Sequence, residues 1–119
     1  MSRIDDKRRR REMRKVRIRK KISGSKKIPR LTVFRSNRYI YVQAIDDLSG
    51  NTLASVSNRE KDLLMLKNVV ADAHKLGEKM GERLKEEKIK CVVFDRNGYS
   101  YHGIIKSLAE GVRKTGIKF

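Results

Sequence analysis

The side chains that could do chemistry gather in one short stretch near the carboxyl end of the chain. An unbroken apolar run, Cys91–Phe94, stops at Asp95 and is followed by Arg-Asn-Gly-Tyr-Ser-Tyr-His at positions 96–102. This stretch offers one cation, one amide, two phenols and one imidazole, which can donate hydrogen bonds and stack but include no activated nucleophile. We therefore take six loop residues as candidate binding residues: Arg96, Asn97, Gly98, Tyr99, Tyr101 and His102.

The apolar run predicts the strand that must position this loop. We expect the strand to span Ile89–Phe94 and, because it lacks alternation, to be covered on both faces, as in a sheet flanked by helices. Asn97-Gly98 predicts a tight turn, because Asn and Gly tolerate positive φ. Ligand-binding loops of α/β sheets tend to lie at the carboxyl end of such a strand. We expect Asp95 to serve the turn, and Gly98 and Gly103 to serve backbone geometry or close approach.

The charge of the chain predicts the class of its partner. The 119 residues include 31 Lys and Arg against 14 Asp and Glu, a formal net charge of +17. Residues 1–27 hold 14 of the basic residues and 3 of the acidic ones. Neutralising the phosphates of a nucleic acid releases counterions, which gives an affinity that falls steeply with salt. We therefore expect a nucleic acid as partner.

Residues 1–27 are expected to form a basic arm that is disordered when free. Its apolar residues are too sparse to form a stripe wide enough to bury. Arginine pairs with phosphate bidentately and stacks on bases, so the arm favours nucleic-acid contact over a solvated tail or a localisation signal. The candidate contact residues of the arm are Arg8, Arg9, Arg10, Arg11, Arg14, Arg17, Arg19, Lys20 and Lys21.

Metal, disulfide and membrane functions find little support in the sequence. One cysteine, Cys91, and two histidines, His74 and His102, cannot build an ordinary structural zinc site or a disulfide framework. No apolar run approaches the roughly 20 residues that span a bilayer, and the amino terminus lacks the apolar region of a signal peptide. We expect no cofactor, no metal, no small-molecule substrate and a cytoplasmic location.

Three strands are predicted ahead of the loop strand. Leu31–Arg35 and the alternating run Arg38–Asp46 are separated by the two residues Ser36-Asn37, which predicts a β-hairpin. A turn-forming cluster then leads to a third strand over Thr52–Ser57. These three strands are expected to form an antiparallel meander.

The predicted hairpin carries a second group of candidate binding residues. Tyr39 and Tyr41 lie on one side of the alternating run, opposite Ile40 and Val42. Each tyrosine could stack on a base, worth about 1–3 kcal/mol, and packing against a helix is an equal alternative for both. The candidate residues of the hairpin are Arg30, Arg35, Ser36, Asn37, Arg38, Tyr39 and Tyr41.

Two amphipathic helices complete the predicted domain. After a charged link at residues 58–62, apolar residues from Leu66 to Leu84 recur at helical spacing. We expect Gly77 and Gly81, on the buried side, to let this helix sit close on the sheet. A second helix is expected from about Gly103 to Thr115. The order β-β-β-α-β-α predicts an α/β fold.

Two motifs carry a resemblance to a known family. Leu31–Ile45 (LTVFRSNRYIYVQAI) and Val93–Gly103 (VFDRNGYSYHG) together resemble the bacterial large-subunit ribosomal protein eighteen family, the 5S rRNA binders. The last four residues, GIKF, resemble the usual ending of that family. The resemblance covers the whole chain, with the basic arm at residues 1–27 ahead of a globular domain at residues 28–119.

The resemblance implies both a fold and a function. The fold is a single small α/β domain of the ribonuclease-H-like translational-machinery type, with two helices packed on a mixed sheet whose second strand is antiparallel to its neighbours. The function is that of a structural constituent of the large ribosomal subunit. Such a protein binds 5S rRNA and helps attach it to 23S rRNA in the central protuberance, beside neighbouring large-subunit proteins. The candidate residues above would then contact RNA.

Two other functions fit parts of the sequence. A nuclease on this kind of sheet would need several carboxylates converging on metal ions about 4 Å apart. The candidates are Asp46, Asp47 and Asp95, and an antiparallel second strand would carry the first two to the opposite end from Asp95, so we expect no enzyme. The other alternative is a sequence-indifferent basic nucleic-acid binder of the chromatin or RNA-chaperone type, which lacks a saturable preference for one folded RNA.

Overall fold

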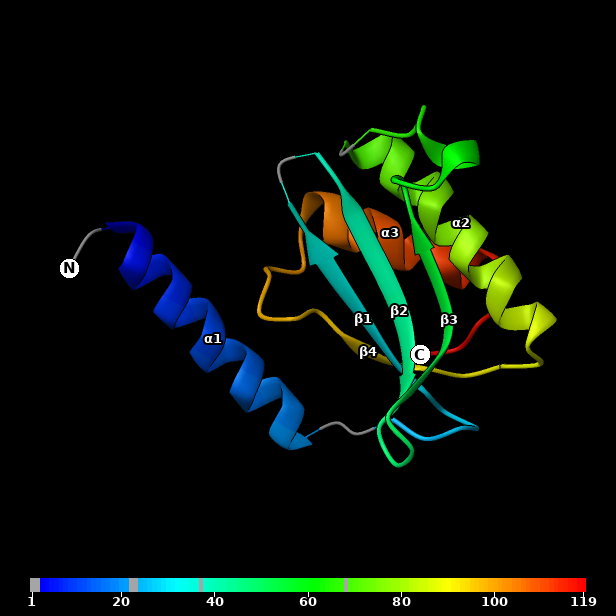
Figure 1. The fold of residues 1–119 in the computed structure, drawn as a ribbon, viewed down its shortest axis with the longest axis horizontal. Helices are drawn as coiled ribbons and strands as arrows, with labels where there is room; N and C mark the ends of the chain where they lie inside the picture. Colours follow the sequence, from blue (N-terminus) through cyan, green and yellow to red (C-terminus); the bar gives the residue numbers. More distant parts are fainter. Residues whose placement is uncertain (1–2, 22–23, 37, 68) are drawn as a thin grey trace.

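A four-stranded mixed sheet carries two helices on one of its faces, and a third helix lies to the side (Figure 1). The structure, a computed structural model, describes residues 3–21, 24–36, 38–67 and 69–119, and in the first range the side chains of residues 7–17. In chain order the elements are α1 (Arg3–Lys21), β1 (Arg30–Arg35), β2 (Ile40–Asp46), β3 (Asn51–Ser57), the short 3₁₀ helix η1 (Lys61–Leu63), α2 (Val70–Glu86), β4 (Val93–Asp95) and α3 (Gly103–Lys114).

The sheet has the strand order β3-β2-β1-β4. β2 runs antiparallel to both β1 and β3, and β4 runs parallel to β1. The α/β class, the antiparallel meander and the mixed sheet with an antiparallel second strand are thereby confirmed. Helix α2 carries the chain from β3 at one edge of the sheet to β4 at the other.

Alternation along β2 sorts its side chains between two faces. Ile40, Val42 and Ala44 are fully buried on the helix side, as the period of two predicts. Tyr41 and Gln43 point to the opposite face, which α2 and α3 leave uncovered (Figure 1). The sheet therefore has one covered face, which holds the core, and one open face.

The hairpin between β1 and β2 closes one residue later than predicted. β2 begins at Ile40 and not at Arg38, and its first residue pairs with Arg35. The backbone N–H of Ser36 then donates to the carbonyl of Tyr39 at 2.8 Å, which extends the ladder beyond the strands. Ser36 therefore belongs to the closing pair and not to the link.

The contact between α2 and α3 explains the helix glycines. A Cβ atom on Gly77 would overlap the carbonyl oxygen of Leu108, and one on Gly111 would overlap the carbonyl oxygen of His74. A Cβ atom on Gly81 would meet the side chain of Thr115. The expectation that Gly77 and Gly81 bring the helix close to the sheet is wrong. They bring it close to α3, because the two helices lie side by side on the covered face.

Helix α2 begins later than the apolar spacing predicts. It starts at Val70, and Leu66 lies in the preceding link. The buried amide of Asn58 accepts a hydrogen bond from the N–H of Ile40 at 2.9 Å and donates to the carbonyls of Arg38 and Leu66 at 3.1 and 3.0 Å. These bonds tie the link to the hairpin, so the link cannot continue as helix.

The loop strand is shorter and less covered than predicted. β4 spans only Val93–Asp95, and Cys91 forms an isolated bridge with Lys118. β4 is an edge strand with helices on one face only, so Val93 and Cys91 are half-buried and the prediction of cover on both faces is wrong. The ring of Phe119 stacks on that of Phe94 with centroids 5.6 Å apart, which closes the core at this edge.

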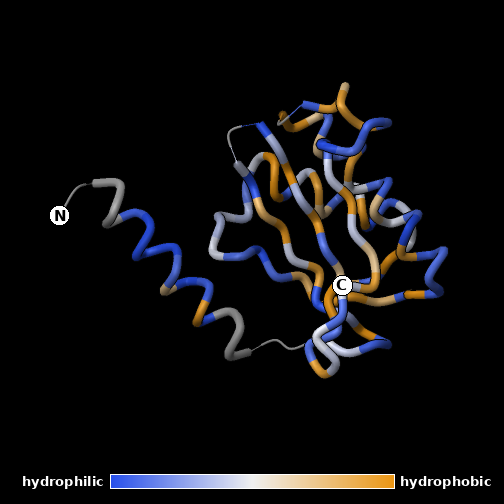
Figure 2. Tube along the Cα trace, in the orientation of Figure 1, coloured by the Kyte–Doolittle hydropathy of each residue, from blue (hydrophilic) through white to orange (hydrophobic). Residues whose placement is uncertain are grey.

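The described side chains of helix α1 are mostly exposed, and only Arg11, Arg14 and Lys15 among them are half-buried. Figure 2 shows its described part as hydrophilic nearly throughout, and the side chains of Met13 and Val16 are both 54% exposed. Helices of this kind gain little stability from packing, so disorder of the free arm stays a prediction. Within the part of the chain that the structure describes, no helix has the length and apolar character needed to cross a membrane.

Candidate nucleic-acid interface

The loop after β4 has the turn geometry that its sequence predicts. Asn97 and Gly98 have φ values of 54° and 77°, in the left-handed region. The carboxylate of Asp95 is fully buried, and one of its oxygens accepts the backbone N–H of Asn97 at 2.9 Å. Asp95 therefore holds the turn, as expected, and presents no oxygen to solvent.

Arg30 connects Asp95 to a second carboxylate. Its guanidinium donates to Asp95 at 2.7 Å and to Asp47 at 3.0 Å, and its side chain is only 11% exposed. Hydrogen bonding to Asp47 raises the pKa of Arg30, which keeps the cation charged despite its burial. Arg30 is thus an internal ion-pair residue and does not join the exposed candidates.

The same contacts correct the argument about carboxylates. Asp47 and Asp95 do not lie at opposite ends of the sheet, because Asp47 follows β2 beside the start of β1 and the short strand β4 ends there too. The guanidinium of Arg30 lies between them and pairs with both carboxylates. Among the described residues, no group of three or more His, Cys, Asp or Glu side chains could hold a metal ion.

Helix α1 docks on the loop through polar contacts. Arg14 donates to the carbonyl of Gly98 at 2.8 Å, and Arg11 donates to that of Asn97 at 3.4 Å. The backbone of Arg11 comes so close that a Cβ atom on Gly98 would lie 2.6 Å from its carbonyl oxygen. Gly98 therefore serves both uses expected of it, a positive φ and a close approach.

Tyr99 links the arm, the loop and the hairpin. The guanidinium of Arg11 lies 4.4 Å from the centroid of its ring, in cation–π range. Its hydroxyl accepts the N–H of Arg35 and donates to the carbonyl of the same residue, both at 3.1 Å. Tyr101 instead packs edge-on against Phe94 at 6.0 Å and belongs to the rim of the core.

The hairpin tyrosines lie outside the core. Tyr41 is on the open face, 6.2 Å from the ring of Phe34. The guanidinium of Arg59, two residues after the end of β3, donates to the hydroxyl of Tyr41 at 3.0 Å and lies 5.1 Å from the ring centroid of Tyr39. The alternative of packing against a helix is thereby excluded for Tyr41.

The sequence analysis did not single out Phe34 and Arg59, which contact the hairpin tyrosines. The period of two along β1, with Leu31 and Val33 buried, would have placed Phe34 on the open face. For Arg59 the sequence holds no comparable signal, because its contact with Tyr39 depends on how the link after β3 folds.

The remaining candidates divide by exposure. Arg96 is half-buried and donates to the carbonyl of Tyr99 at 2.9 Å, so it braces the loop. Asn97 is buried. The exposed candidates are Arg8, Arg9, Arg10, Arg17, Arg35, Ser36, Arg38 and His102. Outside the described residues lie Asn37 and the side chains of Arg19, Lys20 and Lys21.

Comparison with known proteins identifies the family. The model of the family "Ribosomal L18 of archaea, bacteria, mitochondria and chloroplast" matches residues 5–119. A relative from Treponema denticola, named large ribosomal subunit protein uL18, is 57% identical over 115 residues, which cover 97% of this chain and 96% of the relative. The chain belongs to the ribosomal L18 family.

Further relatives extend the match to the full chain. The uL18 protein of Treponema pallidum is 51% identical over 119 residues, or 100% of this chain and 99% of the relative. That of Listeria innocua is 50% identical over 114 residues, or 96% of each. Membership in the ribosomal L18 family gives the chain a structural, non-enzymatic role in the ribosome, in association with rRNA and other ribosomal proteins.

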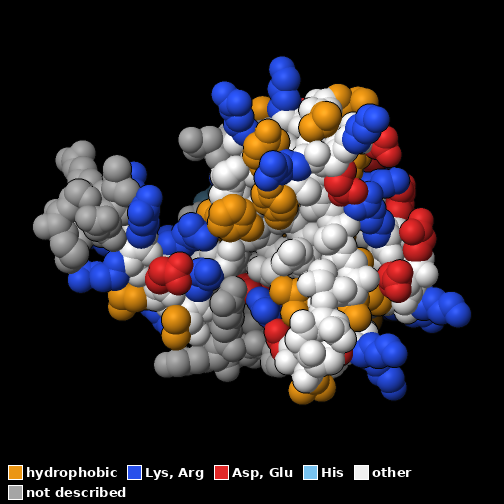
Figure 3. Space-filling model, viewed as in Figure 1, with side chains coloured by type: hydrophobic (Ala, Val, Ile, Leu, Met, Phe, Trp, Pro, Cys, Tyr) orange, Lys and Arg blue, Asp and Glu red, His pale blue; other side chains and the backbone are white. Residues whose placement is uncertain are grey.

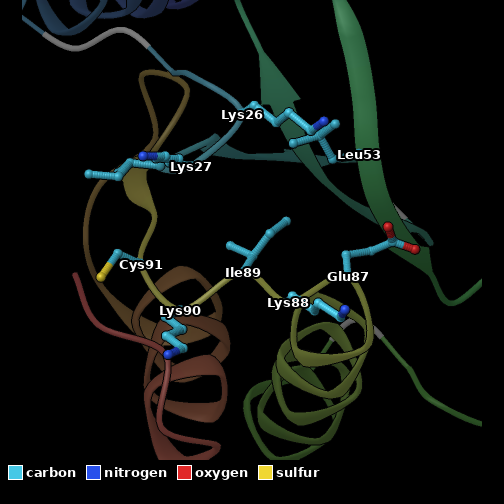
Figure 4. A pocket seen from close by; sticks show the side chains of 9 residues that line it. Lys26, Lys27, Leu53, Glu87, Lys88, Ile89, Lys90 and Cys91 are labelled. Atoms are coloured by element: carbon cyan, nitrogen blue, oxygen red, sulfur yellow. The ribbon is translucent and has the colours of Figure 1, made fainter.

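A pocket of about 500 Å³ is lined by none of the candidate binding residues (Figure 4). Four lysines line it together with Glu87, Cys91 and the apolar side chains of Ile28, Leu53 and Ile89. Figure 4 shows Ile89 projecting into the space between the surrounding segments. The lining is therefore mainly basic and apolar.

Proposed function

We propose that this ribosomal L18 family protein binds 5S rRNA and helps attach it to 23S rRNA in the central protuberance. Neighbouring large-subunit proteins would be its further partners. The observation that carries the proposal is the position of Tyr99, which joins the arm, the loop and the hairpin into one surface. A cytoplasmic location in the large subunit follows from this assignment.

The charge on this surface suits the RNA backbone. Figure 3 shows Lys and Arg side chains along α1 and over the sheet on one face of the molecule. Arginines that face solvent can pair bidentately with phosphates, and such contacts fix the register of a protein on RNA more than they read its sequence. In the proposal this is the role of the exposed arginines Arg8, Arg9, Arg10, Arg17, Arg35 and Arg38.

Selectivity for one RNA requires contacts beyond phosphate. Double-helical RNA hides its base edges in a narrow groove, so proteins read its shape, its 2′-hydroxyls and its unpaired bases. Ser36 and Asn37 at the hairpin tip would bond riboses or base edges, and His102 would add a further contact beside the loop. Tyr39 and Tyr41 would stack on bases. Asn97, Gly98 and Tyr99 would act by holding the arm against the domain, because all three contact α1.

The test compares the affinities of the protein for two folded RNAs. The full chain is titrated with 5S rRNA and with an unrelated folded RNA of the same length, at several salt concentrations. We expect saturable binding to 5S rRNA, with a preference that persists as salt weakens both affinities. Equal binding of the two RNAs at every salt concentration would replace the 5S assignment by the sequence-indifferent basic binder.

A further inference from the structure

The basic and apolar pocket lies between the link that precedes β1 and the link that joins α2 to β4 (Figure 4). Residues 26–28 line one side, residues 87–91 line the other, and Leu53 of β3 completes the lining. The side chain of Ile28 is 45% exposed, so the pocket offers an apolar surface to solvent. Its volume of about 500 Å³ lies in the range of sites that hold ligands or the anchoring side chains of a partner.

The positive charge of the pocket is available to a partner. The lining holds one acidic side chain, Glu87, against four exposed lysines, Lys26, Lys27, Lys88 and Lys90. The ion pairs among the described residues involve none of these four lysines. An anionic ligand would therefore meet lysines that have no carboxylate partner within the described part of the chain.

Lys88 reaches the pocket through an unusual backbone conformation. Its φ is 59°, in the left-handed region, where a residue with a Cβ atom is less stable than glycine. The N–H groups of Lys88 and Ile89 donate to the carbonyls of Lys85 and Leu84, both at 2.9 Å, which is the Schellman pattern at the end of α2. Glycine is the usual residue at this position. A lysine here lowers the stability of the turn and adds a cation to the pocket, and strain of this kind gathers at binding sites.

Hydrogen bonds fix both sides of the pocket before a ligand arrives. The N–H of Ser25 donates to the carbonyl of Ile28 at 2.9 Å, and the Ser25 hydroxyl accepts the N–H of Ile28 at 3.2 Å. These bonds close a turn that carries Lys26 and Lys27. On the other side, the carbonyl of Lys90 accepts a backbone hydrogen bond at 3.0 Å from the C-terminal segment. A site that is formed in advance loses less conformational freedom on binding.

The composition of the lining favours a protein segment over RNA as the occupant. The lining contains no aromatic ring, no arginine and no side-chain amide, the groups that stack on unpaired bases or bind their edges. An RNA backbone would pair with the lysines and leave the apolar side chains in water. A protein segment brings carboxylates for the lysines and an apolar side chain for the centre, as in an interface with an apolar core and a polar rim.

We propose that this pocket docks an acidic segment of another protein. An apolar side chain of the segment packs on Ile28, Leu53 and Ile89, and carboxylates on either side of it pair with the lysines. The site lies outside the residues of the proposed function and does not depend on binding of 5S rRNA.

The probe is a short synthetic peptide with one leucine between aspartates and glutamates. Its control is the same peptide with serine in place of the leucine, which keeps the charge. Each is titrated into the full chain, and the amide signals in nuclear magnetic resonance spectra locate the contact, because the basic arm also attracts acidic peptides. We expect the leucine peptide to shift the signals of Leu53 and residues 87–91 and to bind about tenfold more tightly than the serine peptide.

Lys88→Gly separates binding from folding. Glycine relieves the left-handed conformation, so we expect the thermal unfolding midpoint to rise while the affinity for the leucine peptide falls about threefold. Lys75→Ala removes one exposed charge from α2 outside the pocket and should leave the affinity unchanged. A lysine with only a structural role at position 88 would change stability without changing affinity.

Ile28→Ser tests the apolar contact from the side of the protein. We expect it to weaken the leucine peptide several-fold and to leave the serine peptide unaffected. Met65→Ser is the control, because Met65 is also an exposed apolar residue, at 79%, and does not line the pocket.

Several results would overturn the proposal. They are equal binding of the two peptides, equal affinity of Lys88→Gly and wild type, and signal shifts that are confined to residues 7–17 of the arm. Displacement of the peptide by 5S rRNA, with shifts of the pocket signals by the RNA alone, would make RNA the occupant and would also overturn it. Peptide binding at the pocket by a chain without preference for 5S rRNA would contradict the proposed function and still support this proposal.

Discussion

Two regions of this molecule use arginine in opposite ways. Arg30, at the start of β1, is buried between Asp47 and Asp95, and its guanidinium forms ion pairs with both carboxylates inside the fold. Of the six arginines of α1 whose side chains the structure describes, four face solvent. The difference teaches that net charge alone does not locate an interface. A carboxylate within reach turns an arginine into a structural residue, and its absence leaves the charge for a partner.

Removing the internal arginine should have the largest effect. Arg30→Ala leaves the fully buried carboxylate of Asp95 without its cation, and breaking a buried pair from one side costs about 3–5 kcal/mol. We expect the free energy of unfolding, measured by urea denaturation, to fall by about 3 kcal/mol. Arg9→Ala, at an exposed position of α1, is the control and should change it little. Equal stability of the two variants would remove the distinction between the regions.

Removing exposed charge from the arm should change binding and leave stability intact. In Arg8→Ala/Arg9→Ala/Arg10→Ala we expect the slope of log affinity for 5S rRNA against log salt to become shallower by about 2–3, or about one per lost phosphate contact. The matched control removes three exposed charges from the helix side, at Lys75, Lys85 and Lys106. If both triple variants lower the slope equally, the arm has no special position on the RNA.

The junction between the two regions should give a smaller effect. Gly98→Ala forces a side chain into the left-handed region, at about 1–2 kcal/mol, and toward the carbonyl of Arg11. We expect limited proteolysis to cut α1 faster in this variant while the domain stays folded. Gly50→Ala is the control, since Gly50 also has a positive φ of 73° but no atom near its missing Cβ. Equal cleavage of α1 in both variants would contradict docking through Gly98.

The smallest effect concerns the pair Glu60–Arg83, which is more exposed than the Arg30 pair. The pKa of Glu60 is lowered in the fold, so the contribution of the pair is complete above the ordinary pKa of a glutamate. It is lost as pH falls through the lowered value. Solvent screening limits it to about 0.5 kcal/mol. Glu60→Gln should therefore unfold at a slightly lower urea concentration than wild type at pH 7, and the two should converge in acid; a gap that widens in acid would contradict the pairing.

Local patterns predicted the parts of the fold that depend on local sequence. The alternation in Ile40–Ala44 placed one face of β2 in the core, and the Asn97-Gly98 turn formed with the positive φ values that these residues tolerate. The two motifs of the hairpin and the loop also indicated the family that the comparisons confirm.

The rest depended on which elements become neighbours in space. Whether Gly77 faces a sheet or a helix is decided by the position of α3, and whether Arg30 faces RNA or carboxylates is decided by where β4 ends. The start of α2 was misjudged because the amide of Asn58 binds three backbone groups from the hairpin and the link. No periodicity along the sequence reports such contacts.

The central claim is that the folded domain selects the RNA and the arm supplies most of the salt-dependent affinity. Among the described residues, those of the hydrophobic core all lie between Leu31 and Phe119, so a chain that begins at residue 28 keeps them. The most direct test compares this shortened chain with the full chain in salt-series titrations of 5S rRNA and of an unrelated folded RNA. Our account predicts that the shortened chain keeps its preference for 5S rRNA while the salt slope falls markedly. Loss of the preference together with the arm, or an unchanged slope, would contradict it.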